Sequence, residues 1–313
     1  MRRWLLAVAV LCLAIIGCGA RGATIGTTTG AATVERDQNG AIIVGGTART
    51  YHVHLPPQQS AAAPLFLILH GSGGTGVGTI TLTHMNDLAD KEGVIAVYPD
   101  GLSKGWADGR GASDSDQQGV DDVAFLSQLI ATLQGQYSID SHRIYVTGIS
   151  NGGFMTQRLG CELADRIAAI VPVVATLSTN QAATCAPSRP LPVLYVLGEN
   201  DPLVPYNGGT VRGDRGTILS ATGSLAAWAK LDGCTGAPTM RALPDRVQDE
   251  TRISETLYIN CQGGAQVGLY SVAGGGHTWP SGEQYLPIAL VGRTTHQIDN
   301  DDLWAFLSQF QTP

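Results

Sequence analysis

The chain is poor in charge, and what charge it has is poor in basic residues. Charged side chains make up 14% of its 313 residues, well below the roughly 25% of an average globular protein. Nineteen lysines and arginines stand against 26 acidic residues, for a formal net charge of −7. A nucleic-acid binder needs a basic surface, so that class is excluded. A disordered acidic chain would have fewer apolar residues than the 43% present. An anionic polymer is not expected as a partner unless its charge is masked.

No apolar run is long enough to cross a bilayer comfortably, since a spanning helix needs about 20 residues. The run from Trp4 to Ile16 follows two arginines and is typical of a signal peptide. An apolar residue, a glycine and then Cys18 follow in an order that resembles the bacterial lipobox. We expect residues 1–17 to be a lipoprotein signal peptide and Cys18 to carry a lipid anchor. An ordinary signal peptide with an incidental cysteine is the alternative.

The expected domain organisation follows from this leader. Residues 18–40 are rich in Gly, Ala and Thr at their start, and we expect them to form a flexible tether. Residues 41–313 contain no repeat and no long linker, and we expect one domain. The protein is expected to be secreted and held at the membrane as an extracytoplasmic lipoprotein of the cell envelope.

The cysteines lack the CxxC spacing of a zinc site. Cys12 lies in the expected leader and Cys18 is the expected lipid acceptor, which leaves four cysteines in the domain. Export favours disulfides, and four cysteines allow three pairings. The pairing between sequence neighbours is Cys161–Cys185 with Cys234–Cys261. Each bond would close a loop of about 25 residues and stabilise the fold by about 3 kcal/mol. Partial oxidation is the alternative.

Apolar runs bounded by glycine and proline alternate with helical segments. Such runs are typical of buried strands in a mostly parallel sheet, and the alternation predicts an α/β fold with helices on both faces of the sheet. The expected strands lie near residues 51–55, 65–69, 94–98, 144–146, 167–174, 191–197 and 267–272; the expected helices lie at 121–133, after Gly152, at 219–231 and at 299–310.

Two glycine-rich motifs follow expected strands. The first, His70-Gly71-Ser72-Gly73-Gly74, offers backbone N–H groups for an oxyanion. Residues 71–76 also match the dinucleotide pattern G-x-G-x-x-G, but chance matches are common in a chain with 40 glycines. The second, Gly148-Ile149-Ser150-Asn151-Gly152, is a G-x-S-x-G sequence between a strand and a helix, where a strained turn exposes a nucleophilic serine.

The order of the remaining polar residues predicts a catalytic triad. Asp201 follows the strand that ends near residue 197, and His277 lies on a glycine-rich loop after the strand at 267–272. The order Ser150, Asp201, His277 is the order that α/β hydrolases use. Glu199 is the competing acid, and His296 is the competing base. Asp201 is favoured because Pro202 fixes its turn, and His277 because a strand precedes its loop.

At these motifs the chain resembles the secreted polyhydroxybutyrate depolymerase and feruloyl esterase family of α/β hydrolases. Further motifs of the resemblance are Tyr98-Pro99-Asp100-Gly101, Val120-Asp121-Asp122-Val123 and Asp201-Pro202-Leu203-Val204-Pro205-Tyr206. The resemblance implies the α/β-hydrolase fold, a triad of Ser150, Asp201 and His277, and oxyanion donors at the backbone of Ser72 and Asn151. It also supports the two local disulfides. His70, Gly71 and Gly73 are expected to support the oxyanion loop, and Trp106 and Trp279 are candidates for a substrate-binding wall.

The predicted function is that of a serine esterase, which forms an acyl-enzyme and releases it with water. Its expected substrates are hydroxyalkanoate oligomers or polysaccharides that carry feruloyl or acetyl esters. No cofactor and no metal are expected, because HExxH is absent and the acidic stretch between Asp108 and Asp122 does not fit a calcium loop. The alternative is a catalytically silent binding lipoprotein on a hydrolase scaffold.

Overall fold

The computed structural model describes residues 35–58 and 62–313. The expected signal peptide, Cys18 and most of the expected tether lie outside these residues. Residues 35–313 form one compact unit, and its first strand, β1 (Asp37–Val44), begins before the expected domain boundary at residue 41. This strand belongs to the domain because it pairs along its whole length with β2 (Thr47–His54). In the described ranges no helix has the length and apolarity to cross a membrane.

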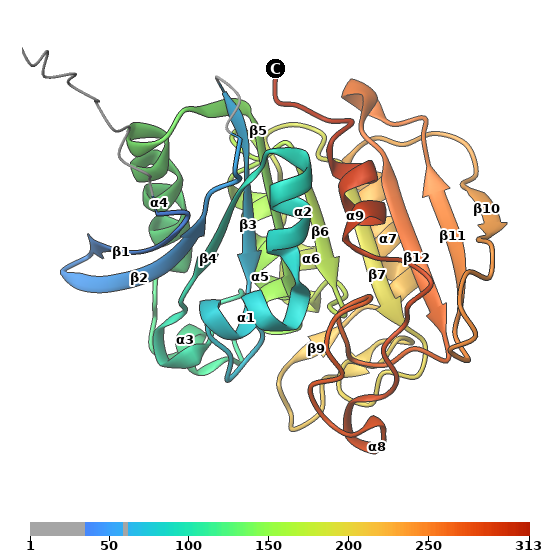
Figure 1. The fold of residues 1–313 in the computed structure, drawn as a ribbon. Coiled ribbons are helices and arrows are strands. Elements are labelled where there is room, and N and C mark those ends of the chain that lie inside the picture. Colours follow the sequence, from blue (N-terminus) through green and yellow to red (C-terminus); the bar gives the residue numbers. More distant parts are fainter. Residues whose placement is uncertain (1–34, 59–61) are drawn as a thin grey trace, which may run out of the picture. The chain divides into compact units, whose positions relative to one another are not determined.

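Within the described residues a mixed sheet of ten strands forms the centre of the domain, in the order β1-β2-β4-β3-β5-β6-β7-β12-β11-β10. The six strands from β4 to β12 in this order run parallel, and the outer strands pair antiparallel (Figure 1). The remaining strands are β3 (Ala63–Leu69), β4 (Ile95–Pro99), β5 (Ile139–Ile149), β6 (Ala169–Val173), β7 (Val193–Gly198), β10 (Thr239–Ala242), β11 (Arg252–Tyr258) and β12 (Val267–Ala273). A separate two-stranded sheet consists of β8 (Gly209–Thr210) and β9 (Thr217–Ile218).

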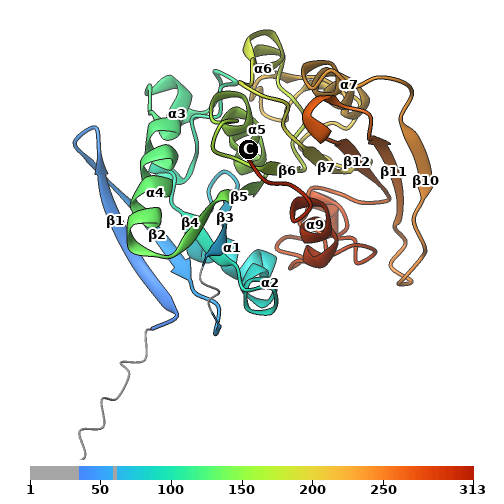
Figure 2. The same ribbon diagram turned by 90° about the horizontal axis from the view of Figure 1, so that it is seen from above.

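Helices cover both faces of the large sheet, as the alternation of segments predicts. Helices α4, α5 and α7 lie over one face, and α1, α2 and α9 lie over the other (Figure 2). The helices are α1 (Gly76–Thr83), α2 (Met85–Glu92), α3 (Asp114–Gln117), α4 (Asp122–Gln136), α5 (Asn151–Glu162), α6 (Thr179–Thr184), α7 (Ala221–Leu231), α8 (Ile288–Val291) and α9 (Asn300–Leu307).

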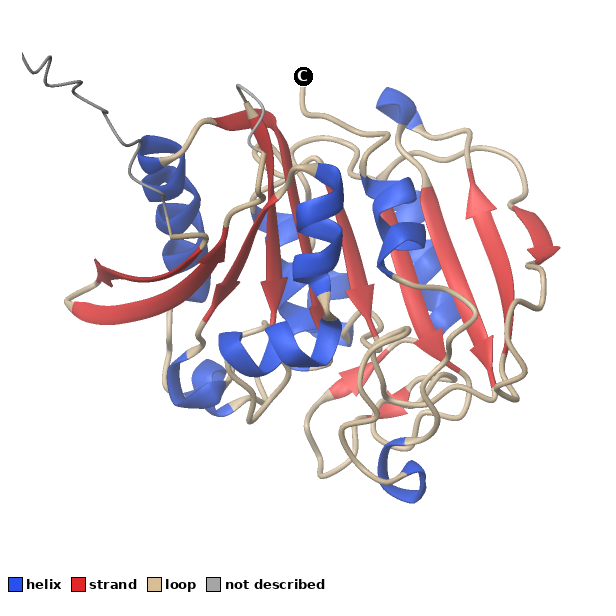
Figure 3. Cartoon of the chain, in the orientation of Figure 1, coloured by secondary structure: helices blue, strands red, loops and turns tan. Residues whose placement is uncertain are grey.

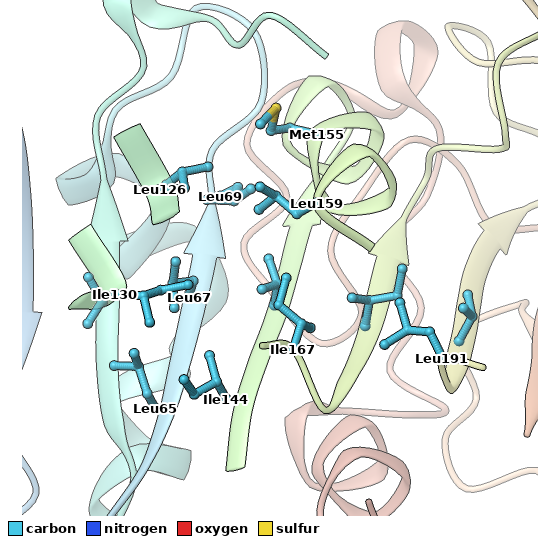
Figure 4. Packing of buried hydrophobic residues seen from close by; sticks show 14 of the residues in the cluster. Leu65, Leu67, Leu69, Leu126, Ile130, Ile144, Met155, Leu159, Ile167 and Leu191 are labelled. Atoms are coloured by element: carbon cyan, nitrogen blue, oxygen red, sulfur yellow. The ribbon is translucent and has the colours of Figure 1, made fainter. Parts of the chain in front are cut away.

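The buried strand β3 shows how the two cores form. All seven of its residues are buried, and alternate side chains point to opposite faces of a strand. Leu65 and Leu67 therefore pack with Leu126 and Ile130 of α4 in one core (Figure 4). Phe66 belongs to the core on the other face, with residues of α2 and α9.

The four cysteines of the domain form the two sequence-local disulfides. Cys161 is bonded to Cys185, and Cys234 is bonded to Cys261. The first bond ties the end of α5 to the end of α6, and the second ties the segment after α7 to the segment after β11.

Because the central strands are parallel, their carboxyl ends meet at one edge of the sheet, where loops gather (Figure 3). Strand β3 ends before His70, β5 before Ser150, β7 before Asp201 and β12 before His277. In α/β folds this edge is where active sites form, so the topology brings the loops that carry the predicted site residues to the same edge.

Candidate active site

Ser150 occupies a strained turn between β5 and α5. Its backbone has φ 57° and ψ −119°, a region that a residue with a Cβ adopts at a cost of about 1–3 kcal/mol. The Ser150 N–H donates to the Val173 carbonyl at 3.0 Å, which holds the turn against the end of β6. The hydroxyl makes no capping hydrogen bond to the helix that begins there. The turn therefore presents the Ser150 side chain without using it structurally.

Glycines flank Ser150 because the backbone segments around it touch. A Cβ on Gly152 would lie 2.3 Å from the Leu69 carbonyl oxygen, and one on Gly148 would lie 2.5 Å from the Gly152 carbonyl oxygen. Real Cβ atoms essentially never come so near to backbone oxygens. The G-x-S-x-G spacing thus lets the turn press against the end of β3.

The expected oxyanion donors lie beside Ser150. Ser72, Ser150 and Asn151 line one pocket. As the first residue of α5, Asn151 has an N–H that no carbonyl of the helix accepts. The Asn151 side chain is fixed, because its Oδ1 accepts from the Trp106 N–H at 2.8 Å and its Nδ2 donates to the Trp106 carbonyl at 3.1 Å. These bonds hold the backbone of Asn151 in place.

His70 supports the loop that carries Ser72. Its Nδ1 lies 2.8 Å from the Gly71 carbonyl oxygen, and its Nε2 accepts from the Gly101 N–H at 2.9 Å. One ring nitrogen therefore donates and the other accepts, which describes a neutral imidazole. Burial lowers the pKa of His70, so the ring stays neutral. Gly73 continues the support, with φ 80° and an N–H that donates to the Lys104 carbonyl at 2.7 Å.

His277 and Asp201 are in direct contact. His277 Nδ1 lies 2.7 Å from Asp201 Oδ2, and both side chains are almost fully buried. Asp201 Oδ1 accepts from the Leu203 and Val204 N–H groups at 2.7 and 2.9 Å. With Nδ1 donating to the carboxylate, Nε2 of the neutral ring is left as the proton acceptor.

A close approach between two loops makes this contact possible. A Cβ on Gly198 would lie 2.4 Å from the Gly276 carbonyl oxygen, and the Asn200 N–H donates to the Gly275 carbonyl at 2.9 Å. The end of β7 and the histidine loop therefore lie against each other. The histidine loop has a further support that the sequence did not indicate: the Tyr285 hydroxyl donates to the His277 carbonyl at 2.9 Å. Burial raises the pKa of Tyr285 to about 12, so this donor stays protonated.

Neither the competing acid, Glu199, nor the competing base, His296, takes part in the contact between Asp201 and His277. Asp201, not Glu199, contacts His277. His296 is exposed, and its backbone N–H donates to Asp249 Oδ2 at 2.6 Å.

The pocket beside Ser150 has a volume of about 410 Å³ and a wall that differs from the predicted one. Trp106 and Trp279 are fully buried and do not line it, so the prediction of an aromatic wall is wrong. Trp106 packs against His70 with ring centroids 4.8 Å apart, and Trp279 Nε1 donates to Asn300 Oδ1 at 2.9 Å. Trp106 thus packs against the oxyanion loop, and Trp279 connects the histidine loop to the start of α9. The apolar part of the wall comes from Leu203, Val204 and Val211, and its charged part from Lys104, Arg110, Arg212, Arg215 and Asp114.

Three acids of the 108–122 stretch form hydrogen bonds or ion pairs within the fold. Asp108 accepts from Arg110 and from Asn151 Nδ2, and Asp122 pairs with the buried Arg49 at 2.5 Å. Asp116 accepts from the N–H groups of Gly109 and Gly111 at 3.0 and 3.1 Å. Among the described residues no group of three or more His, Cys, Asp or Glu side chains is arranged to hold a metal ion.

Comparisons with known proteins identify esterases among the similar chains. Residues 49–185 match the family described as "Esterase PHB depolymerase". The protein named "Putative esterase NocK", from Nocardia uniformis subsp. tsuyamanensis, is 31% identical over 273 residues, which cover 83% of this chain and 79% of that protein. Feruloyl esterase B of Piromyces equi is 31% identical over 261 residues, which cover 80% of this chain but 43% of that longer protein.

A solved structure, the acetyl xylan esterase from Aspergillus awamori, superposes with a TM-score of 0.58. The match covers 87% of this chain and 99% of that one at 15% identity. At this identity the match shows that the two chains share the α/β-hydrolase fold.

Proposed function

Because the chain belongs to the esterase PHB depolymerase family of carboxylic ester hydrolases, we propose that Ser150, His277 and Asp201 form its catalytic triad. Ser150 Oγ attacks the ester carbonyl while His277 Nε2 takes the hydroxyl proton. Asp201 fixes the ring tautomer through Nδ1 and stabilises the imidazolium that forms. His277 then gives the proton to the departing alcohol. Water attacks the acyl-enzyme in a second step of the same kind, releasing the acid and restoring Ser150.

We assign to the backbone N–H groups of Asn151 and Ser72 the stabilisation of the negative charge that forms on the tetrahedral oxygen. Donors of this kind each contribute about 3–4 kcal/mol to transition-state stabilisation in studied enzymes. The bonds of Asn151 to Trp106 and of His70 to Gly71 and Gly101 support this assignment, because they fix both donors before a substrate arrives.

The observation that carries the proposal is the buried contact of 2.7 Å between His277 and Asp201, at the sheet edge where Ser150 stands on its strained turn. A buried histidine whose Nδ1 is held by a carboxylate is poised to act as a base.

The test is hydrolysis of para-nitrophenyl butyrate by the protein without residues 1–17. Ser150→Ala should lose at least about a thousandfold in kcat while remaining folded, and Ser308→Ala, a serine at the end of α9, should retain full activity. A fluorophosphonate probe should label the wild type but not Ser150→Ala. Full activity in Ser150→Ala would exclude Ser150 as the nucleophile. Absence of both turnover and labelling in the wild type would favour the silent binding protein instead.

For the natural substrate we propose hydroxyalkanoate oligomers or polysaccharides that carry feruloyl or acetyl esters. The names of the relatives support this class, although the chain spans less than half of Feruloyl esterase B. A panel of hydroxybutyrate oligomers, methyl ferulate and acetylated xylan, compared by kcat/KM, would separate these possibilities. Turnover of none of them, alongside turnover of para-nitrophenyl butyrate, would reject the proposed class.

We also propose that the protein is secreted and anchored through a lipid on Cys18. Two disulfides in the domain support export, since such bonds persist in oxidising compartments. Cells fed an alkynyl fatty acid should incorporate it into the wild-type protein and not into Cys18→Ser. Equal labelling of both, or labelling of neither, would reject the anchor.

A further inference from the structure

The pocket beside Ser150 has a charge opposite in sign to that of the chain. Lys104, Arg110, Arg212 and Arg215 line it, together with one carboxylate, Asp114. In the whole chain the balance is reversed, with 19 basic residues to 26 acidic ones. Basic side chains therefore outnumber acidic ones in the wall of the pocket beside the proposed nucleophile.

Three of these four cations form no ion pair within the described part of the chain. Arg110 is buried, and its Nε and Nη2 donate to Asp108 Oδ2 at 3.0 and 2.7 Å. Lys104, Arg212 and Arg215 are exposed, and across residues 35–58 and 62–313 their side chains have no ion pair or hydrogen bond with another residue. Their positive charges are available to a ligand in the pocket.

The loops that carry these cations are fixed relative to Ser150. Arg110 Nη1 donates to the Arg215 carbonyl at 3.0 Å, and the Arg110 guanidinium lies 4.0 Å from the centre of the Phe154 ring on α5. The carbonyl of Lys104 accepts from Gly73 in the oxyanion loop. The loop at 102–116 thus contacts both α5 and the oxyanion loop, and the loop at 203–216 is hydrogen-bonded to the 102–116 loop.

We propose that this pocket selects esters that carry a carboxylate close to the scissile bond, and that Lys104, Arg212 and Arg215 bind this carboxylate. Guanidinium groups suit the task because they bind carboxylates through two parallel hydrogen bonds. An oligomer of hydroxy acids with a free acid end presents such a group, and so does an ester attached to a uronic acid. The proposal rests on the proposed function and names the substrate class of the same site. The acidic net charge, which argues against anionic partners, does not describe this pocket.

The test compares matched pairs of esters in which a carboxylate is replaced by an uncharged carboxamide. Mono-(para-nitrophenyl) adipate and its uncharged adipamate place the charge on the acid side of the ester, and para-acetoxybenzoate and para-acetoxybenzamide place it on the alcohol side. The wild type should prefer the charged member of at least one pair by about tenfold in kcat/KM, the gain typical of hydrogen bonds to a charged group. The pair that shows the preference identifies the side on which the carboxylate binds.

The double variant Arg212→Gln/Arg215→Gln should lower the charged-to-uncharged ratio about tenfold, chiefly through KM. Lys230→Gln is the matched control, because Lys230 is an exposed lysine at the end of α7 that does not line the pocket. It changes the net charge in the same direction and should leave the ratio as in the wild type. Raising the ionic strength from about 0.02 to 0.5 M should shrink the preference in the wild type, since salt screens exposed charges.

The outcomes separate this inference from the proposed function. Turnover of all four esters without a preference for charge, or a preference that survives in the double variant, would overturn the inference and leave the esterase standing. Absence of any turnover would overturn the proposed function. In that case calorimetric titration of Ser150→Ala with the adipate pair decides: tighter binding of the charged ester supports the carboxylate site, and equal binding overturns it.

Discussion

The two sides of the candidate active site are built in different ways. On the nucleophile side the turn around Ser150 and the loop after β3 meet through backbone, with glycines where a Cβ would lie within 2.6 Å of a carbonyl oxygen. On the opposite side Lys104, Arg212 and Arg215 have exposed side chains, and the nearest atom to a Cβ on Gly213 would be Arg215 Nε at 3.8 Å, an ordinary van der Waals contact. The first side is therefore sterically constrained, whereas the second has room for a methyl group at Gly213.

The constrained side carries the proposed chemistry, and the open side carries the proposed selectivity for charged esters. Donors for an oxyanion must hold positions to within fractions of an ångström, so every residue of the turn is restricted by its neighbours. A carboxylate of a substrate can be met by flexible cationic side chains at several positions, so the wall needs only a fixed backbone beneath them. Substitutions should therefore act strongly on the first side and mildly on the second.

The largest effect is expected for Gly152→Ala. The new methyl group would lie 2.3 Å from the Leu69 carbonyl oxygen and 2.6 Å from that of His70, so α5 must move away from β3. Unfolding free energy should fall by at least about 3 kcal/mol. Because Asn151 moves with the helix, kcat/KM for para-nitrophenyl butyrate should fall by about 100-fold or more. Chemical denaturation and steady-state kinetics measure the two losses.

Gly135→Ala provides the control for this substitution. Gly135 lies near the end of α4 with nothing within 4 Å of its Cβ position. There the change should raise the unfolding free energy by about 0.5–1 kcal/mol and leave the activity unchanged. A Gly152→Ala variant as stable and active as this control would show that the turn is not sterically constrained.

The same difference explains how far the sequence predicts the structure. Steric constraint leaves a pattern in the chain, so the G-x-S-x-G turn, the H-G-x-G-G loop and the histidine loop were recognisable before their geometry was known. The parallel strands were recognisable because they are continuous buried runs. Strands β1, β10 and β11 of the large sheet were missed, since most of their side chains are exposed or half-buried and none of the three forms a continuous apolar run.

The pocket wall left no comparable pattern. Arg212 and Arg215 reach the pocket because the chain turns sharply between them, with φ 80° at Gly213 and φ 58° at Asp214, and no local rule predicts where such a loop folds back. The aromatic wall failed for a related reason: a tryptophan next to a site residue in sequence can point into the core, as Trp106 and Trp279 do. The triad of Ser150, Asp201 and His277 stays a prediction until its chemistry is measured.

A second prediction concerns the buried ion pair beneath the wall. Asp122 accepts from Arg49 at 2.5 Å and from the Ala107 N–H at 2.7 Å, so it fixes the base of the 102–116 loop. The sequence indicates only an acid at a helix start. Asp122→Asn leaves a buried guanidinium without its counter-charge, which should cost about 3 kcal/mol of unfolding free energy. Glu162→Gln, which weakens the more exposed pair with Arg158 on α5, should cost at most about 0.5 kcal/mol. Equal losses in denaturation experiments would contradict a special role for the buried pair.

A third prediction concerns a buried carboxylate that lacks such a partner. Burial raises the pKa of Asp232 to about 7, and its Oδ2 has no hydrogen-bond partner among the described residues. The folded protein then holds a proton that the unfolded chain releases near pH 4, so stability should fall as the pH rises from about 4 to 7. Asp232→Asn should remove this slope and raise the unfolding free energy by about 1–3 kcal/mol at a pH of about 8. The sign is opposite to that for Asp122→Asn. Denaturation curves from acid to mild alkali would show it, and a slope unchanged in the variant would exclude Asp232 as its source.

The smallest effect is expected for Gly213→Ala, in the pocket wall. The new methyl group would meet only Arg215 Nε, at 3.8 Å, so the cost comes from the backbone, because φ 80° is unfavourable for a residue with a Cβ. Such a conformation costs about 1 kcal/mol, so unfolding free energy and turnover of uncharged esters should both change far less than in Gly152→Ala. The ratio of kcat/KM for charged and uncharged esters should change more than the turnover of uncharged esters, because the backbone shift at Gly213 lies between Arg212 and Arg215. A loss of uncharged-ester turnover as large as that of Gly152→Ala would mean that the wall positions the reacting atoms themselves, and the division between the two sides of the site would not hold.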